Sequence, residues 1–106
     1  PLWEVVATRV RDEWNVNGNC MLVVGATYPA ELARVRELCP DLPFLVPGVG
    51  AQGGDVEAVI AGGLDAIGGG LLINASRSVI FAHDPAAEAR ATRDAIAGAV
   101  AARGAP

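Results

Sequence analysis

The chain has 106 residues, of which 52% are hydrophobic and 19% are charged, so it forms at most one domain and has enough apolar side chains for a core. Its formal net charge of −4 disfavours a nucleic-acid or anionic-membrane surface, which needs a basic field. Apolar runs are interrupted well before the roughly 20 residues of a membrane span. No signal-like segment opens the chain, and we expect a cytoplasmic protein.

Helical and strand-like patterns alternate along the chain. Residues 2–15 predict a helix with an apolar stripe formed by Trp3, Val6, Val10 and Trp14. Short apolar runs predict strands at residues 20–24, 44–46 and 71–73. Further helices are predicted after Thr27, Asp55 and Asp84, because threonine and aspartate commonly cap helix starts.

This α-β-α-β-α-β-α order, with short connections, predicts a parallel sheet covered by helices. Three strands make a poor closed domain but suit one side of a (β/α)8 barrel, which usually has about 250 residues. The chain starts at Pro1, and its only methionine, Met21, lies inside an apolar run. We therefore interpret the sequence as a piece of a longer protein.

Two cysteines, Cys20 and Cys39, have no CxxC spacing and no neighbouring histidine. This pattern favours small buried hydrophobic residues in a reducing compartment over a disulfide framework or a zinc site. We therefore predict no metal site.

Two segments carry residues suited to phosphate. The segment 47–55 places four glycines and Gln52 between a strand and a helix, where backbone amides can turn toward an anion. The segment 74–78 follows the next strand and contains Arg77, a bidentate phosphate donor. Both segments leave the same edge of a parallel sheet, which predicts a shared phosphate site. The alternatives are a glycine-rich turn without a ligand and a surface salt bridge for Arg77.

These segments resemble one known family. Residues 22–27 (Leu-Val-Val-Gly-Ala-Thr), 45–55 (Leu-Val-Pro-Gly-Val-Gly-Ala-Gln-Gly-Gly-Asp) and 72–77 (Leu-Ile-Asn-Ala-Ser-Arg) together resemble the orotidine 5′-phosphate decarboxylase family, in its longer bacterial branch. The resemblance covers nearly the whole chain. It implies that residues 1–106 are a single partial domain, the C-terminal part of a TIM barrel with roughly strands 6–8 and their helices.

The resemblance also implies roles for individual residues. Gln52 would bridge the nucleotide phosphate and the pyrimidine carbonyl, and Arg77 would clamp the phosphate with help from the amide of Ser76. Pro47 would pack near the base, and Gly53 would belong to the loop that closes over the phosphate. The family converts orotidine 5′-phosphate to UMP and carbon dioxide in pyrimidine biosynthesis without a metal or cofactor.

The chain departs from the family pattern in one respect. The family protonates the carbon that loses carbon dioxide with a lysine of an Asp-x-Lys-x-x-Asp motif, whereas all eight basic residues here are arginine. We therefore expect no catalytic residue in this chain and no decarboxylation by it alone. The expected partner is the missing N-terminal part of the barrel or another copy of this chain. The parent enzyme is expected to be a homodimer. Two alternatives remain: another phosphate-binding barrel enzyme, such as a sugar-phosphate aldolase or synthase, and a non-catalytic nucleotide-binding module.

Overall fold

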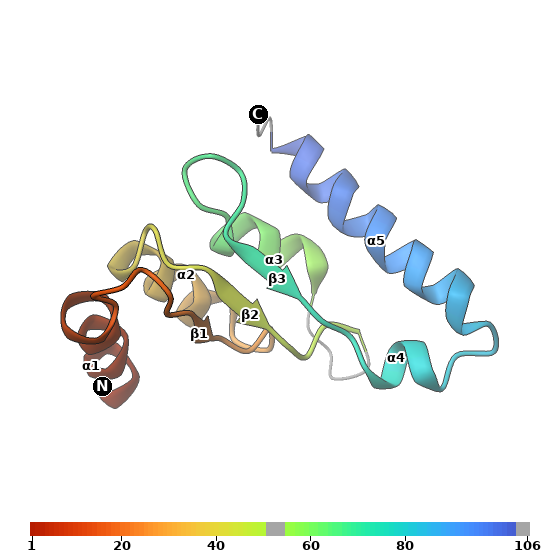
Figure 1. Ribbon diagram of the computed structural model, residues 1–106. Coiled ribbons are helices and arrows are strands. Elements are labelled where there is room, and N and C mark those ends of the chain that lie inside the picture. The colour runs from red at the N-terminus through yellow and green to blue at the C-terminus, as the bar shows by residue number, and fades with distance from the viewer. Residues whose placement is uncertain (51–54, 104–106) are drawn as a thin grey trace.

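Three parallel strands form the centre of the molecule. The computed structural model describes residues 1–50 and 55–103. Strands β1 (Leu22–Val23), β2 (Phe44–Val46) and β3 (Leu71–Ile73) form one sheet with β2 in the middle (Figure 1). Both pairings are parallel. The predicted strands are confirmed, although the first is shorter than residues 20–24.

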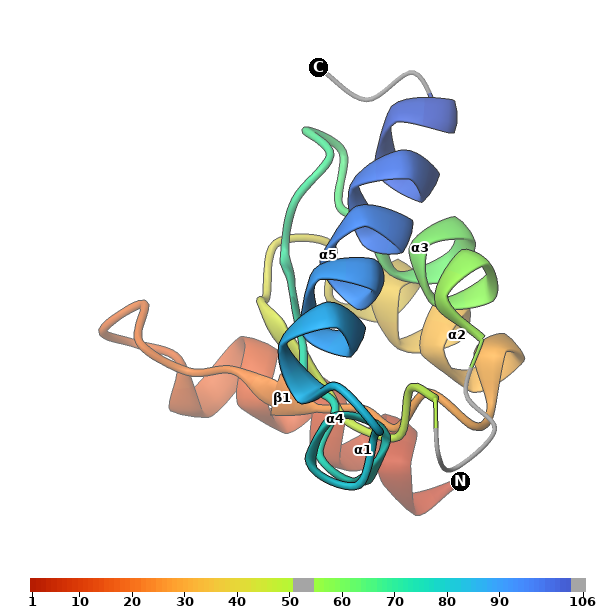
Figure 2. The ribbon, with the colours of Figure 1, turned by 90° about the vertical axis from the view of Figure 1, so that its right-hand side faces the viewer.

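Helices connect the strands and cover one face of the sheet. Figure 2 shows α2, α3 and α5 on the same side of it. The alternation of strand and helix predicted from the sequence is confirmed. Within the described part of the chain, no helix is both long and apolar enough to cross a membrane. The helical elements are α1 (Leu2–Arg9), the π-helix η1 (Val10–Trp14), α2 (Pro29–Leu38), α3 (Val56–Gly63), α4 (Arg77–Ile80) and α5 (Pro85–Ala102).

The core lies between β2 and helices α2 and α3. Phe44 and Val46 of β2 are fully buried, as are Leu32 of α2 and Val59 of α3. Each such side chain contributes about 1.5–3 kcal/mol by leaving water. Cys39 is also buried, as predicted, and burial raises the pKa of its thiol, whereas Cys20, predicted to be buried as well, is only half-buried. The best-packed part of the chain is therefore the unit α2-β2-α3.

Two of the three predicted caps are confirmed. The carboxylate of Asp55 accepts a hydrogen bond from the amide of Glu57 at 2.9 Å, and that of Asp84 accepts one from Ala87 at 3.1 Å. The Thr27 cap is wrong, because α2 begins one residue later, with Tyr28 at the cap position and no side-chain bond. Pro29 sets the start of α2 instead, since its fixed φ suits the first helical position and that position needs no N–H.

The first helix changes its winding at Val10. Residues 10–14 form a π-helical turn, in which the amide of Asn15 donates to the carbonyl of Val10 at 3.0 Å. The predicted stripe holds for Val10, which is buried, but not for Val6 and Trp14, which are 41% and 60% exposed. One extra residue in the turn rotates Trp14 away from the sheet.

The amino edge, where the strands begin, is held by Arg36 of α2. Its guanidinium donates to the carbonyls of Gly63 at 2.7 Å, Leu42 at 2.7 Å and Gly70 at 3.0 Å, and it stacks 3.8 Å from the centroid of the Phe44 ring. Burial lowers the pKa of Arg36, and the charge of nearby Asp65 opposes that shift. One side chain thus joins the ends of α2 and α3 to the starts of β2 and β3.

Gly70 lies close to both the carboxylate of Asp65 and the guanidinium of Arg36. A Cβ atom at this position would lie 2.8 Å from an Asp65 carboxylate oxygen and 2.9 Å from an Arg36 guanidinium nitrogen. The residue also has a φ of +81°, which L side chains rarely adopt. Glycine is therefore required here for both space and backbone conformation.

The opposite face of the sheet is uncovered among the described residues. Val23, Leu45 and Leu72 lie side by side in the register and point away from the helices. Val23 is 71% exposed and Leu72 is 60% exposed, whereas the neighbouring Leu71 packs toward α3. Such an exposed apolar row indicates a surface that packs against another protein segment.

Candidate functional site

The predicted site residues lie at the carboxyl edge, where the three strands end. The ladder continues past the strand ends, because the Ala26 amide donates to the Pro47 carbonyl at 2.9 Å and the Asn74 amide donates to the Val46 carbonyl at 3.2 Å. All three connections therefore leave the sheet at the same level. In parallel α/β folds, this edge is where ligands bind.

The segments that follow β2 and β3 come into direct contact. Gly50 has a φ of +86°, and a Cβ atom on it would lie 2.9 Å from the hydroxyl oxygen of Ser78. Only a residue without a side chain allows this approach. The structure therefore brings the glycine-rich segment beside the Ser-Arg segment, as predicted from the parallel order of the strands.

Ser76 and Arg77 lie at the start of α4, beyond the ends of β2 and β3 (Figure 1). The carbonyl of Ser76 accepts from the amide of Ile80 at 2.8 Å, which fixes the turn. Both side chains are exposed, and the Arg77 guanidinium forms no ion pair with another described residue. An exposed guanidinium can donate two parallel hydrogen bonds to a phosphate.

The remaining predicted site residues divide into two groups. Pro47 is half-buried, follows β2 directly and faces the same side as Leu45, so the structure places it on the uncovered face. Gln52 and Gly53 lie outside the described residues. The roles of all five residues therefore stay predictions, with Pro47, Ser76 and Arg77 placed at one edge.

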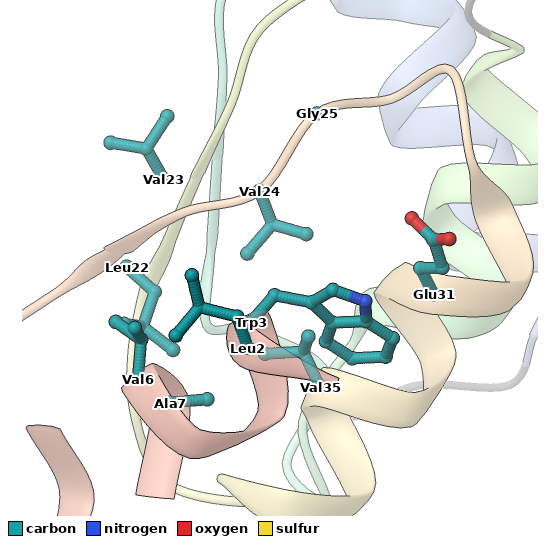
Figure 3. A pocket seen from close by; sticks show the side chains of 10 residues that line it. All are labelled: Leu2, Trp3, Val6, Ala7, Leu22, Val23, Val24, Gly25, Glu31 and Val35. Atoms are coloured by element: carbon teal, nitrogen blue, oxygen red, sulfur yellow. The ribbon is translucent and has the colours of Figure 1, made fainter. Parts of the chain in front are cut away.

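A pocket separate from the predicted phosphate site lies beside β1, between α1 and α2. It has a volume of about 560 Å³. Figure 3 shows the indole of Trp3 extending toward Val35 and Glu31, while Val23 points to the other side of the strand. The lining is apolar except for Glu31, so it suits apolar side chains and not a phosphate. Its residues are Leu2, Trp3, Val6, Ala7, Leu22, Val23, Val24, Gly25, Glu31 and Val35.

Helix α4 was not predicted from the sequence. Four residues are too few to show helical periodicity, and the only signal was Ser76, a residue type common at helix starts. The short helix matters because it turns the chain immediately after β3. Arg77 is consequently presented from a helix and not from a loop.

Comparisons with known proteins agree with this geometry. Residues 2–92 match the model of the family described as Orotidine 5′-phosphate decarboxylase / HUMPS. The chain is 58% identical over 102 residues to an orotidine 5′-phosphate decarboxylase of Azoarcus sp. (strain BH72), covering 90% of this chain and 38% of that relative. The chain is 59% identical to an orotidine 5′-phosphate decarboxylase of Aromatoleum aromaticum, again over 90% of this chain and 38% of that relative. The chain therefore spans well under half the length of the curated relatives it matches.

Solved structures show the same likeness. The OMP decarboxylase of Leishmania donovani has a TM-score of 0.86 and 47% identity, covering 93% of this chain and 38% of that one. The UMP synthase of the same organism has a TM-score of 0.90 and 52% identity, over 93% of this chain and 22% of that one. These proteins are TIM barrels, which confirms the prediction of an α/β barrel fragment. The chain belongs to the Orotidine 5′-phosphate decarboxylase / HUMPS family.

Proposed function

We propose that this chain is the phosphate-binding part of an orotidine 5′-phosphate decarboxylase. The observation that supports this most is the contact between Gly50 and Ser78, which sets Arg77 beside the glycine-rich segment. Arg77 and the neighbouring amides would hold the nucleotide phosphate, with Gln52 and Gly53 completing the site and Pro47 packing against the base. Binding energy at the phosphate, remote from the reacting carbon, would then lower the barrier at the base.

The proton donor would come from outside these 106 residues. Decarboxylation breaks the bond between the ring carbon and the carboxylate, leaves the electron pair on that carbon, and needs a proton to neutralise it. No lysine is present in the chain, and arginine is too weak an acid for this step. We therefore propose that residues 1–106 form a partial domain, which becomes active only with the lysine-bearing part of the barrel.

A chimera tests this proposal. In it, the present chain replaces the matching segment of the Azoarcus decarboxylase, a replacement guided by 58% identity over 102 residues. We expect the chimera to convert orotidine 5′-phosphate to UMP, measured by the change in ultraviolet absorbance, and the isolated chain to show no turnover. The unmodified Azoarcus enzyme is the control. A chimera with native circular dichroism that neither turns over nor binds UMP would contradict the proposal.

The uncovered sheet face predicts association. Both edge strands, β1 and β3, have a free side within the described sheet, and Val23 and Leu72 are exposed beside them. We expect the isolated chain to form dimers or larger species in sedimentation velocity, and to bind the separately expressed N-terminal part of the relative. Replacing both residues by threonine should weaken this association. A compact monomer at all concentrations would be the contrary result.

A further inference from the structure

We propose that Asn74 is a specificity-determining residue that binds the pyrimidine base, an inference that rests on the proposed function. Asn74 follows β3 and extends its ladder by one residue, through the hydrogen bond from its amide to the Val46 carbonyl. In the register, Leu72 lies beside Leu45. Two residues further along each strand, Asn74 therefore lies beside Pro47 and on the same face. By the same extension, Gly25 lies on the other side of Pro47.

These three residues form an end row, Gly25–Pro47–Asn74, on the uncovered face of the sheet. Exposure alternates along β3 and continues past it, with Leu72 and Asn74 exposed and Leu71 and Ile73 half-buried. Asn74 therefore lies on the same face as Leu72. A Cβ atom on Gly25 would have no neighbour within 4 Å, so the row is open at that end.

The chemistry of the end row singles out one residue. Gly25 has no side chain, and Pro47 has no N–H and only an apolar ring. Asn74 carries an amide that both donates and accepts, and it forms no side-chain hydrogen bond with another described residue. The edge of a pyrimidine ring alternates carbonyl oxygens with an N–H, and one amide can pair with such an edge.

The spacing relative to the phosphate site also fits a nucleotide. The row spans three neighbouring strands, each about 4.8 Å from the next, which is wide enough for a flat ring. Asn74 and Arg77 are three residues apart, a chain length that reaches at most about 10 Å. This upper limit allows the two side chains to reach the phosphate and the base of a single nucleotide. Arg77 therefore holds one end of the ligand and Asn74 the other.

Two ligands separate this inference from the proposed function. UMP and ribose 5-phosphate share the sugar phosphate, and only UMP has a base. In the chimera, we expect Asn74→Ala to weaken UMP binding about tenfold in isothermal titration calorimetry, the effect of losing one or two hydrogen bonds, and to leave ribose 5-phosphate binding unchanged. Asn74→Leu, which keeps a side chain of similar size, should behave in the same way.

Asn19→Ala is the matched control, because Asn19 is an exposed asparagine near the opposite end of the strands. It should leave the affinity for both ligands unchanged. Asn74 variants that bind UMP as the unmodified chimera does, or that lose both ligands equally, would overturn the inference. If the unmodified chimera fails to bind UMP, the proposed function itself is wrong.

Discussion

Replacing Arg36 with methionine should unfold the α2-β2-α3 unit or destabilise it by more than about 3 kcal/mol. Methionine keeps the apolar stem but removes every donor, and the carbonyls of Gly63, Leu42 and Cys39 would lose the hydrogen bonds that Arg36 donates. A buried polar group without a hydrogen bond costs about 1–3 kcal/mol, so three such groups together remove a large part of the about 5–15 kcal/mol that stabilises a native domain. Urea unfolding followed by circular dichroism measures the loss.

Arg34→Met is the matched control for that experiment. Arg34 lies two residues away on the same helix and is exposed, with ion pairs to Glu4 at 2.9 Å and Glu37 at 3.2 Å. Exposed pairs of this kind contribute little to stability because water screens them, so the midpoint should move little. Equal shifts for the two variants would show that the buried carbonyl contacts of Arg36 do not stabilise the fold.

Replacing Arg77 with alanine should produce the largest loss of ligand binding. A guanidinium that forms charge-assisted bonds to a phosphate contributes about 2–3 kcal/mol, so UMP and ribose 5-phosphate should both bind the chimera about 30- to 150-fold more weakly. Arg77→Lys should restore only part of the affinity, because an ammonium group cannot form the bidentate pair. Isothermal titration calorimetry with both ligands gives these values.

Arg90→Ala provides the comparison for Arg77. Arg90 is an exposed arginine of α5, so its loss changes the net charge by the same amount without altering α4. Its variant should bind both ligands normally. If Arg77→Ala binds them equally well, Arg77 does not hold the phosphate, and the proposed arrangement of the site fails.

The order of strands and helices could be predicted from local patterns. The apolar runs gave the three strands, and the caps Asp55 and Asp84 act through bonds to residues two and three positions away. Such signals are visible in any short stretch of sequence. The proximity of the segments 47–55 and 74–78 could also be predicted, because parallel strands bring their carboxyl ends to one edge.

The features that the sequence did not reveal depend on residues far apart. Arg36 looks like a surface residue of α2, and its role appears only when Gly63 and Gly70, 27 and 34 positions away, come to lie around it. The contact between Gly50 and Ser78 joins two different connections in the same way. The π turn that displaces Trp14 is likewise not encoded by a recognisable spacing.

Gly70 sets a limit on how this protein can evolve. Any other residue at this position would have to adopt a left-handed backbone conformation, and its Cβ atom would have to displace Asp65 and Arg36. No single change elsewhere compensates for both effects. A library that randomises this codon should return glycine almost alone among folded variants. At the end of the sheet opposite the proposed phosphate site, the position of Gly70 is therefore closed to change.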